Sequence, residues 1–177
     1  MRRLVLGIIL GAAIMSVNAQ ETFQKGTKLL GATIGFNDSG TPLALSYEVG
    51  VKDNLFNVEK LNLGIGGYFG YYGYSSTVTQ FGGTSTTSYS ILSPGIRILG
   101  HYQVIDKLDA YAGPSFGFSV QHGATEASGM ETKTENKILF TWGFIGGLRY
   151  ELTPNWGVFV EGGKATGSFT LGAAYKF

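Results

Sequence analysis

The sequence of 177 residues contains no cysteine, so no disulfide can hold the fold together. Charged residues are also scarce, because Asp, Glu, Lys and Arg make up 14% of the chain against about a quarter in ordinary soluble domains. A surface that faced only water would be short of charge. The few basic residues form no block or stripe, which excludes nucleic acid as a partner. The length is that of a single domain.

The N-terminal segment accounts for part of the apolar excess. Two arginines precede an apolar run from Leu4 to Met15, and small residues end at Ala19. This order predicts a secretory signal peptide over residues 1–19, followed by one domain over 20–177. The apolar core is too short to span a bilayer, which takes about 20 helical residues. Because no cysteine follows it, a lipoprotein anchor is excluded.

Helical periodicity is missing from the rest of the chain, and no apolar stretch there reaches the length of a membrane helix. Apolar and polar residues instead alternate with a period of two, in segments of about ten residues. Strands of this kind predict an all-β fold, namely an eight-stranded antiparallel up-and-down transmembrane β-barrel with its apolar face toward lipid. The eight segments are 28–36, 43–51, 61–71, 90–103, 109–120, 138–151, 156–163 and 168–177.

The connections between these segments differ at the two ends of the predicted barrel. The two longest, 74–88 and 121–136, fall at the same end, as the outer loops of transmembrane barrels do. They are interpreted either as flexible, solvated loops or as a surface that meets an extracellular partner. The segment 83–90 is rich in β-forming residues, which favours an extension of the third and fourth strands beyond the membrane. Such a protruding sheet offers its edge to a partner.

The polar alternate residues point into the barrel in this prediction. Eight strands enclose only enough room for side chains, and inward glycines leave space for the long ones. Counted from the end with the short turns, Glu48 and Arg149 lie at similar positions along their strands, and so do Arg97 and Glu161. We therefore expect inward ion pairs. A satisfied polar core is the favoured interpretation, and a narrow passive pore for ions or small solutes is the alternative. The predicted interior cluster is Glu48, Arg97, His101, Arg149 and Glu161, with Lys176 on the same face.

Two patterns that resemble catalytic sites are not favoured. The stretch Gly113–Gly117 matches G-x-S-x-G, but this motif needs a strand–turn–helix context and here lies inside an alternating strand. Ser119, His122 and Glu126 are the one group that could imitate a lipid-modifying enzyme at the outer rim, although a solvated loop histidine is far more frequent. Two histidines without cysteine provide no zinc-ligand spacing. We therefore expect no catalysis, no cofactor and no metal site.

Four stretches resemble small outer-membrane β-barrels of Gram-negative bacteria, in particular the porin-family and outer-membrane protein A- and X-like eight-stranded barrels common in Bacteroidota. They are LSYEVGVKDN (45–54), DKLDAYAG (106–113), TPNWGVFVEGG (153–163) and LGAAYKF (171–177). The resemblance implies a monomer in outer-membrane lipid with a role in envelope integrity or cell-surface contact. It also implies that Leu171, Ala173, Tyr175 and Phe177 are the signal read by the barrel-assembly machinery.

A soluble secreted barrel of the lipocalin kind is a separate alternative. Such a barrel would bury its apolar alternate residues and expose the polar ones. In this sequence the charged residues share their face with glycine, and the other face carries the aromatic residues. This distribution favours the membrane orientation.

Overall fold

The computed structural model describes residues 22–36, 40–80, 83–127, 133–163 and 168–177, so the predicted signal peptide lies outside the described residues. The described chain is almost entirely β-structure, with one short 3₁₀ turn, η1 (Leu55–Asn57). No helix in these ranges has the length and apolar character needed to cross a membrane. The strands are β1 (Lys28–Phe36), β2 (Leu43–Lys52), β3 (Leu61–Gln80), β4 (Gly83–Ile105), β5 (Leu108–Ala127), β6 (Lys133–Glu151), β7 (Trp156–Gly163) and β8 (Phe169–Lys176).

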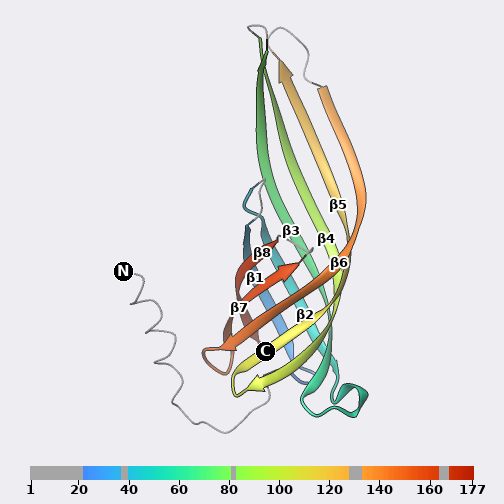
Figure 1. Ribbon diagram of the computed structural model, residues 1–177, viewed down its shortest axis with the longest axis vertical. Coiled ribbons are helices and arrows are strands. Elements are labelled where there is room, and N and C mark those ends of the chain that lie inside the picture. Colours follow the sequence, from blue (N-terminus) through green and yellow to red (C-terminus); the bar gives the residue numbers. More distant parts are fainter. Residues whose placement is uncertain (1–21, 37–39, 81–82, 128–132, 164–167) are drawn as a thin grey trace, which may run out of the picture.

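The strands form a closed ring in which each is antiparallel to its neighbours in sequence (Figure 1). β1 also pairs with β8, with Leu30 opposite Tyr175 and Ile34 opposite Leu171. Closure satisfies the backbone N–H and C=O groups of the first and last strands, which would each cost several kcal/mol if left unpaired in hydrocarbon. The predicted eight-stranded antiparallel up-and-down transmembrane β-barrel is confirmed.

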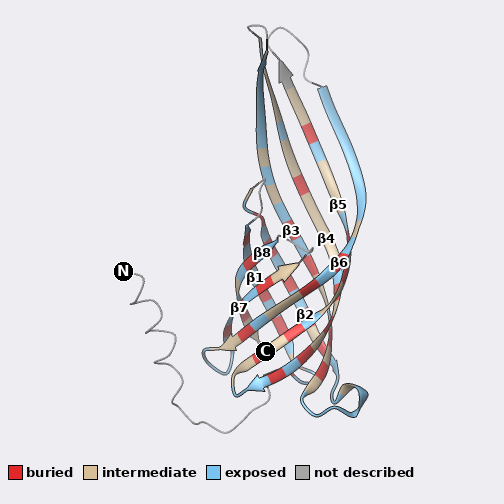
Figure 2. Cartoon of the chain, in the orientation of Figure 1, coloured by how far each residue is buried: buried red, intermediate tan, exposed pale blue. Residues whose placement is uncertain are grey.

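The two faces of the barrel wall are opposite in character. Along β2 and β7 buried and exposed residues alternate one by one, and Figure 2 shows the buried positions concentrated where all eight strands meet. The outward side chains are apolar, with Trp142 62% and Phe144 68% exposed. The inward ones are polar, with Glu48 1% and Arg149 4% exposed. The lipocalin-like alternative requires the reverse orientation and is therefore wrong.

The strands differ in length, and this shapes the molecule. β3 to β6 are 19 to 23 residues long, whereas β1, β2, β7 and β8 have 8 to 10. The four long strands continue on one side well beyond the ring (Figure 1). We call this extension, made of residues 72–80, 83–91, 121–127 and 133–137, the protruding sheet. It rises from the end that we call the loop end, and the opposite end is the turn end.

The protruding sheet corrects the predicted loops. The segments 74–88 and 121–136 lie mostly in strands, and only 81–82 and 128–132 connect them. The predicted extension of the third and fourth strands through 83–90 agrees with β3 and β4. Cross-strand pairs explain the added length, since hydroxyl pairs and aromatic pairs stabilise antiparallel strands. These pairs are Ser75–Ser88, Thr77–Thr86 and Thr87–Thr125, with oxygens 3.0 to 3.1 Å apart, and the stacked rings of Tyr74 and Tyr89.

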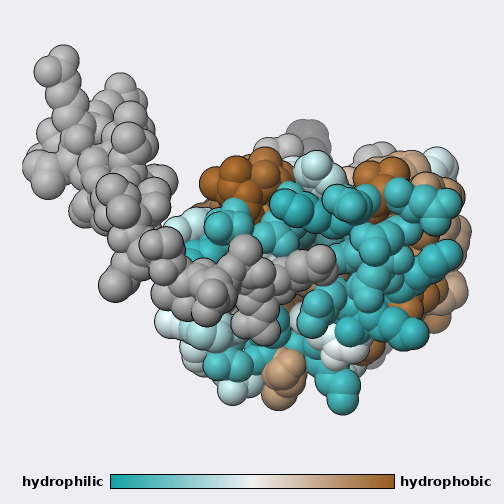
Figure 3. Space-filling view, turned by 90° about the horizontal axis from the view of Figure 1, so that it is seen from below, coloured by the Kyte–Doolittle hydropathy of each residue, from teal (hydrophilic) through white to brown (hydrophobic). Residues whose placement is uncertain are grey.

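The turn end has three connections. Residues 106–107 and 152–155 are tight turns, and 53–60 is longer and contains η1. Seen from this end, polar residues cover much of the visible face and hydrophobic residues lie toward its margins (Figure 3). This arrangement fits a barrel whose turn end meets water while its sides meet lipid.

Candidate functional site: a buried polar network

Six ionisable side chains meet inside the barrel, and we call them the buried network. They come from five strands, and each points inward because it occupies a polar alternate position of its strand. Their exposed fractions lie between 0 and 8%. The members are Glu48 on β2, Arg97 and His101 on β4, Asp109 on β5, Arg149 on β6 and Glu161 on β7.

Arg97 links two carboxylates from β2 and β7, two strands that do not pair with each other. Its Nη2 donates to Oε2 of Glu48 at 3.1 Å, and its Nη1 donates to Oε2 of Glu161 at 3.2 Å. The Tyr111 hydroxyl donates to the same Glu161 oxygen at 3.2 Å. Charged groups buried in this way need both a counter-charge and hydrogen bonds, and this half of the buried network supplies both.

His101 links two further carboxylates. Its Nε2 lies 2.6 Å from Oε1 of Glu48, and its Nδ1 lies 2.8 Å from Oδ2 of Asp109. Arg149 donates from Nη2 to the same Asp109 oxygen at 2.5 Å. The six groups therefore form one chain in which acids and bases alternate, from Glu161 at one end to Arg149 at the other.

The charge of the buried network is balanced when His101 is an imidazolium. A neutral imidazole has one N–H and one lone pair, so one of its nitrogens would face a carboxylate lone pair. Both ring nitrogens lie within hydrogen-bond distance of carboxylates, an arrangement that the doubly protonated ring satisfies. Three cations then face three anions, and the interior carries no net charge away from water.

The predicted interior residues are all brought inside the barrel. Arg97 contacts Glu161 as expected, but Arg149 forms its ion pair with Asp109 and not with the expected Glu48. The reason is register, since Asp109 and Arg149 are directly opposite on neighbouring strands. Lys176 lies at the turn end, where its Nζ is 2.6 Å from Oε1 of Glu151.

Asp109 was missed by the sequence analysis. It is the first residue of the predicted segment 109–120, at the junction with a turn, and it has the same parity as the inward Tyr111 and Ser115 two and six positions later. The structure begins β5 at Leu108, so Asp109 is already part of the wall and is 0% exposed. Alternate residues of a strand point to the same face, so counting back in steps of two from Tyr111 identifies Asp109 as an inward residue.

A second missed feature lies upstream of β1. The ring of Phe23 is 2% exposed and is stacked on His101, with the ring centroids 3.9 Å apart. The guanidinium carbon of Arg149 lies 5.6 Å from the same ring centroid. An isolated aromatic residue just after the predicted cleavage site is the only sequence signal for this contact.

The interior leaves little free space around the buried network. Two cavities lined by Arg97 have a volume of about 10 Å³ each. That is close to the lower limit for holding a single water molecule, about 10–15 Å³ on the same measure. Cavities of this size do not pass hydrated ions, so the geometry supports the filled core over the narrow pore.

The candidate catalytic groups are not assembled. Ser119 and His122 are three positions apart on β5, so their side chains leave opposite faces of the sheet. His122 Nδ1 lies 2.7 Å from Oδ1 of Asn136, and the Ser119 hydroxyl accepts a hydrogen bond from Gln121. The backbone of Glu126 pairs with Thr86 farther along the protruding sheet. The rim site predicted as a third alternative is therefore not formed by these residues.

Ser115 of the G-x-S-x-G match also lacks the context of a nucleophile. It lies in the middle of β5, is 1% exposed and donates to the carbonyl oxygen of Gly143 at 3.4 Å. A nucleophile elbow would place it at a sharp strand-to-helix turn. Across the ranges that the structure describes, no group of three His, Cys, Asp or Glu side chains is arranged to hold a metal ion.

The C-terminal residues complete the outer wall. Leu171 is 40% and Phe177 64% exposed. The Tyr175 ring packs edge-on against Trp156 and Phe177, with centroids 5.0 Å apart in both pairs. The backbone N–H of Phe177 donates to the carbonyl oxygen of Lys28 at 3.0 Å, so the chain is hydrogen-bonded to β1 up to its last residue.

Comparison with known proteins adds evidence on the fold. No protein-family model and no curated protein sequence matches the chain. Among solved structures, a major outer membrane protein from Thermus thermophilus is similar with a TM-score of 0.56 and 14% identity, over 85% of this chain and 99% of that one. Ail, the attachment invasion locus protein of Yersinia pestis, was solved in complex with the heparin analogue sucrose octasulfate. It is similar with a TM-score of 0.55 and 12% identity, over 87% of this chain and 100% of that one.

Neisserial surface protein A is similar with a TM-score of 0.52 and 12% identity, over 85% of this chain and 95% of that one. At such identities the likeness concerns the fold. The predicted resemblance to small eight-stranded outer-membrane barrels is thereby confirmed at the level of architecture.

Proposed function

We propose that this chain is an integral protein of the bacterial outer membrane, with a sealed barrel as its anchor and the protruding sheet as a contact surface outside the cell. Two observations support the membrane placement. The outer wall carries exposed apolar side chains on every strand, and the charged groups of the buried network are enclosed. The fold is shared with several outer-membrane barrels. The segment 1–19 serves in this proposal as the export signal.

The protruding sheet carries the functional part of the proposal. β2 pairs with β3 only as far as Tyr71, and β7 pairs with β6 only as far as Ile145. Gly40 lies beside Tyr72 and Gly73, so within the described strands residues 74–80 and 133–144 have a neighbour on one side only. A row of unpaired backbone groups is a template for another strand.

The two free edges of this sheet differ in charge. Residues 133–137 of β6 include two lysines and a glutamate, which protect an edge against strand pairing. Residues 74–80 of β3 read YSSTVTQ and contain no charged side chain. We assign the edge of β3 as the surface that pairs with an extended segment of a partner protein.

A monomer suffices for this contact role. In this proposal the barrel interior does not transport ions or solutes. The buried network and its cavities of about 10 Å³ support a barrel that does not conduct. Assembly in the membrane would use Leu171, Ala173, Tyr175 and Phe177 as the signal for the barrel-assembly machinery. Their outward position on the last strand fits this role.

The membrane placement is tested by fractionation of cells that make the protein, followed by a heat-modifiability gel shift. We expect the protein in the outer-membrane fraction, with different mobilities before and after boiling. Recovery in the soluble periplasmic fraction would overturn the placement, whatever the role of the protruding sheet.

The contact role is tested by the attachment of cells that display the protein to host or bacterial cells. We expect attachment above that of cells without the protein. Val78→Lys puts a charge on the edge of β3 without removing the Thr77–Thr86 hydroxyl pair and should abolish the gain, whereas Thr134→Lys on β6, which leaves the Asn136–His122 contact in place, should preserve it. Equal attachment of both variants and the unaltered protein would contradict the assignment of the β3 edge.

A further inference from the structure

We propose that residues Thr22–Thr27 are a plug that closes the turn end of the barrel and keeps water from the buried network. This role is separate from the contact surface at the loop end. It gives a function to a short segment that precedes the first strand. The argument rests on where Phe23 sits, how the segment is attached, and what lies on either side of it.

Phe23 covers the buried network from the turn end. Its ring lies flat on His101 at a centroid distance of 3.9 Å and an interplanar angle of 20°. Arg149 lies against the ring as well, at 5.6 Å. Both neighbours are cations in the charge-balanced network, and an aromatic face attracts a cation more strongly where water is excluded. Thr22, at 1% exposed, and Phe23, at 2%, are as buried as the centre of the barrel.

The segment is attached to the barrel wall by specific hydrogen bonds. The Asn62 side-chain amide donates to the Phe23 carbonyl oxygen at 2.5 Å. The N–H of Gly26 donates to the Gly50 carbonyl at 2.8 Å, and the N–H of Gly50 donates to the Thr27 carbonyl at 2.9 Å. The N–H of Lys25 donates to the Asp53 carboxylate at 2.6 Å. The plug is therefore bound to β2, β3 and the connection between them.

The wall is shaped to receive the plug. A Cβ atom at Gly50 would overlap the carbonyl oxygen of Gln24. A Cβ atom at Gly64 would lie 2.9 Å from the Phe23 ring and would overlap the Glu48 carboxylate. Both positions have room for the segment only because they are glycine.

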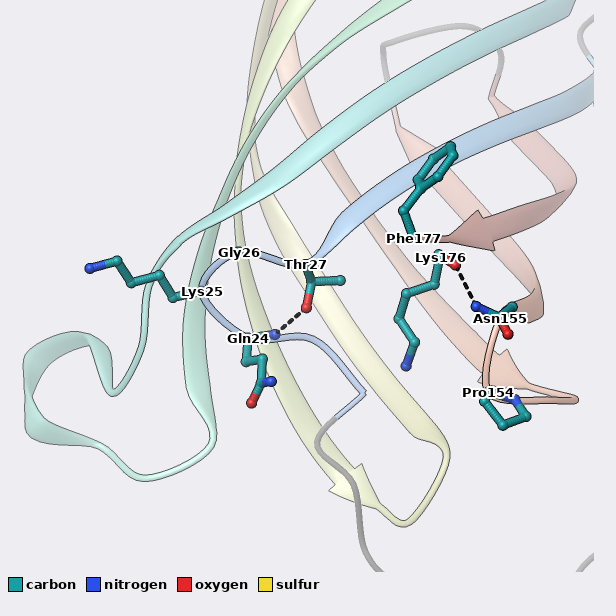
Figure 4. A pocket seen from close by; sticks show the side chains of 8 residues that line it. All are labelled: Gln24, Lys25, Gly26, Thr27, Pro154, Asn155, Lys176 and Phe177. Carbon is teal, nitrogen blue, oxygen red and sulfur yellow. Dashed lines mark hydrogen bonds between the residues drawn. The ribbon is translucent and has the colours of Figure 1, made fainter.

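The free space on the two sides of the segment differs greatly in size. Outside it, residues 24–27 border an open pocket of about 420 Å³ together with the 152–155 turn and the last two residues (Figure 4). Inside it, the cavity next to Glu48 and Arg149 holds about 10 Å³. Phe23 and the bonds of residues 24–27 thus separate the solvent from the charges.

The plug can be tested by thiol labelling, because the chain contains no cysteine. Ala174 is 5% exposed and lines the small cavity with Glu48 and Arg149, so Ala174→Cys reports water entry at that point. The folded A174C protein in lipid vesicles is treated with a small water-soluble methanethiosulfonate. We expect slow labelling with Phe23 in place and labelling about tenfold faster after Phe23→Gly, since a thiol reacts only where the reagent and water reach it.

Phe56→Gly is the matched control, because Phe56 is 81% exposed at the same end and has a positive φ of 56° that glycine adopts readily. We expect this change to leave the labelling rate unaltered. If F23G does not give the heat-modifiable folded band, Phe23→Leu replaces it, with a severalfold increase expected from the loss of the flat ring. If the A174C thiol is labelled at the same rate with Phe23 present and with Phe23 replaced, the proposal that residues Thr22–Thr27 exclude water is wrong, whether that rate is fast or slow.

Discussion

Arg97 and Glu161 are 64 positions apart in the sequence and form an ion pair inside the barrel, with Nη1 3.2 Å from Oε2. The pair is one link in a chain of six alternating charges that crosses the interior. Three of the five links, Arg97–Glu161, Arg97–Glu48 and His101–Glu48, connect strands that are not neighbours in the ring, so these contacts form only when the barrel is closed. The charges of the buried network are therefore satisfied together only in the closed state, and removal of one partner leaves an uncompensated buried charge.

Arg97→Met should destabilise the barrel strongly. The change leaves Glu48 and Glu161 without the guanidinium that both contact, and removing one partner of a buried ion pair typically costs about 3–5 kcal/mol. Urea unfolding in lipid vesicles, followed by tryptophan fluorescence, measures the loss. Lys133→Met is the control, because Lys133 and Glu135 are 78% and 75% exposed and such surface pairs contribute at most about 1 kcal/mol. Equal losses would show that the buried network does not stabilise the fold.

Gly113→Ala should be poorly tolerated, for a reason unrelated to catalysis. A Cβ atom at this position would overlap the backbone carbonyl oxygen of Ile98 on the neighbouring strand. Backbone cannot move aside cheaply, so we expect a loss of about 1–3 kcal/mol or a lower yield of folded protein. Gly67→Ala is the matched change, since its nearest neighbour is the carbonyl oxygen of Gly95 at 3.5 Å, an ordinary contact. A G113A protein as stable as G67A would contradict the close approach of β4 and β5.

Tyr89→Ala should loosen the protruding sheet without unfolding the barrel. The Tyr89 ring stacks on Tyr74 at 4.9 Å and lies over Gly123, where an added Cβ atom would be 3.1 Å from the ring. We expect faster hydrogen exchange in the segments around residues 74 and 89. Exchange in the parts of the strands nearer the turn end should be unchanged. The same urea midpoint as the unaltered protein is the second expected result. A shift of the global midpoint would show that the sheet and the barrel unfold as one unit.

Phe177→Ala should reduce assembly in cells more than it reduces stability. The ring is 64% exposed on the outer wall, so its loss removes little buried area. If it belongs to the assembly signal, the amount of heat-modifiable protein in the outer membrane should fall severalfold while refolding of the purified chain into detergent stays normal. Phe169→Ala, at the other end of the same strand and 47% exposed, should not have this effect. If the F177A and F169A variants give equal amounts of heat-modifiable protein in the outer membrane, Phe177 is not part of the assembly signal.

The alternation of residues determined most of the fold. In a barrel wall the direction of each side chain depends only on its position along its own strand, and so the inward and outward sets could be assigned from local pattern. Trp142 and Phe144 were placed outside, and Glu48 and Arg149 inside, without knowledge of any partner. The number of strands and their closure followed from the same pattern, because a sheet in lipid cannot leave an edge unpaired.

The tertiary structure alone decided how these residues meet. Arg149 pairs with Asp109 because the register of β5 and β6 puts them opposite each other, and a register is a relation between strands that neither strand encodes alone. The length of the protruding sheet depends on cross-strand hydroxyl and tyrosine pairs, which the pattern of each separate segment presents as loop residues. Phe23 contacts His101 across 78 positions of the sequence, so only the folded barrel brings the two rings together. Local periodicity decides which face a residue takes, and long-range contact decides which partner it finds there.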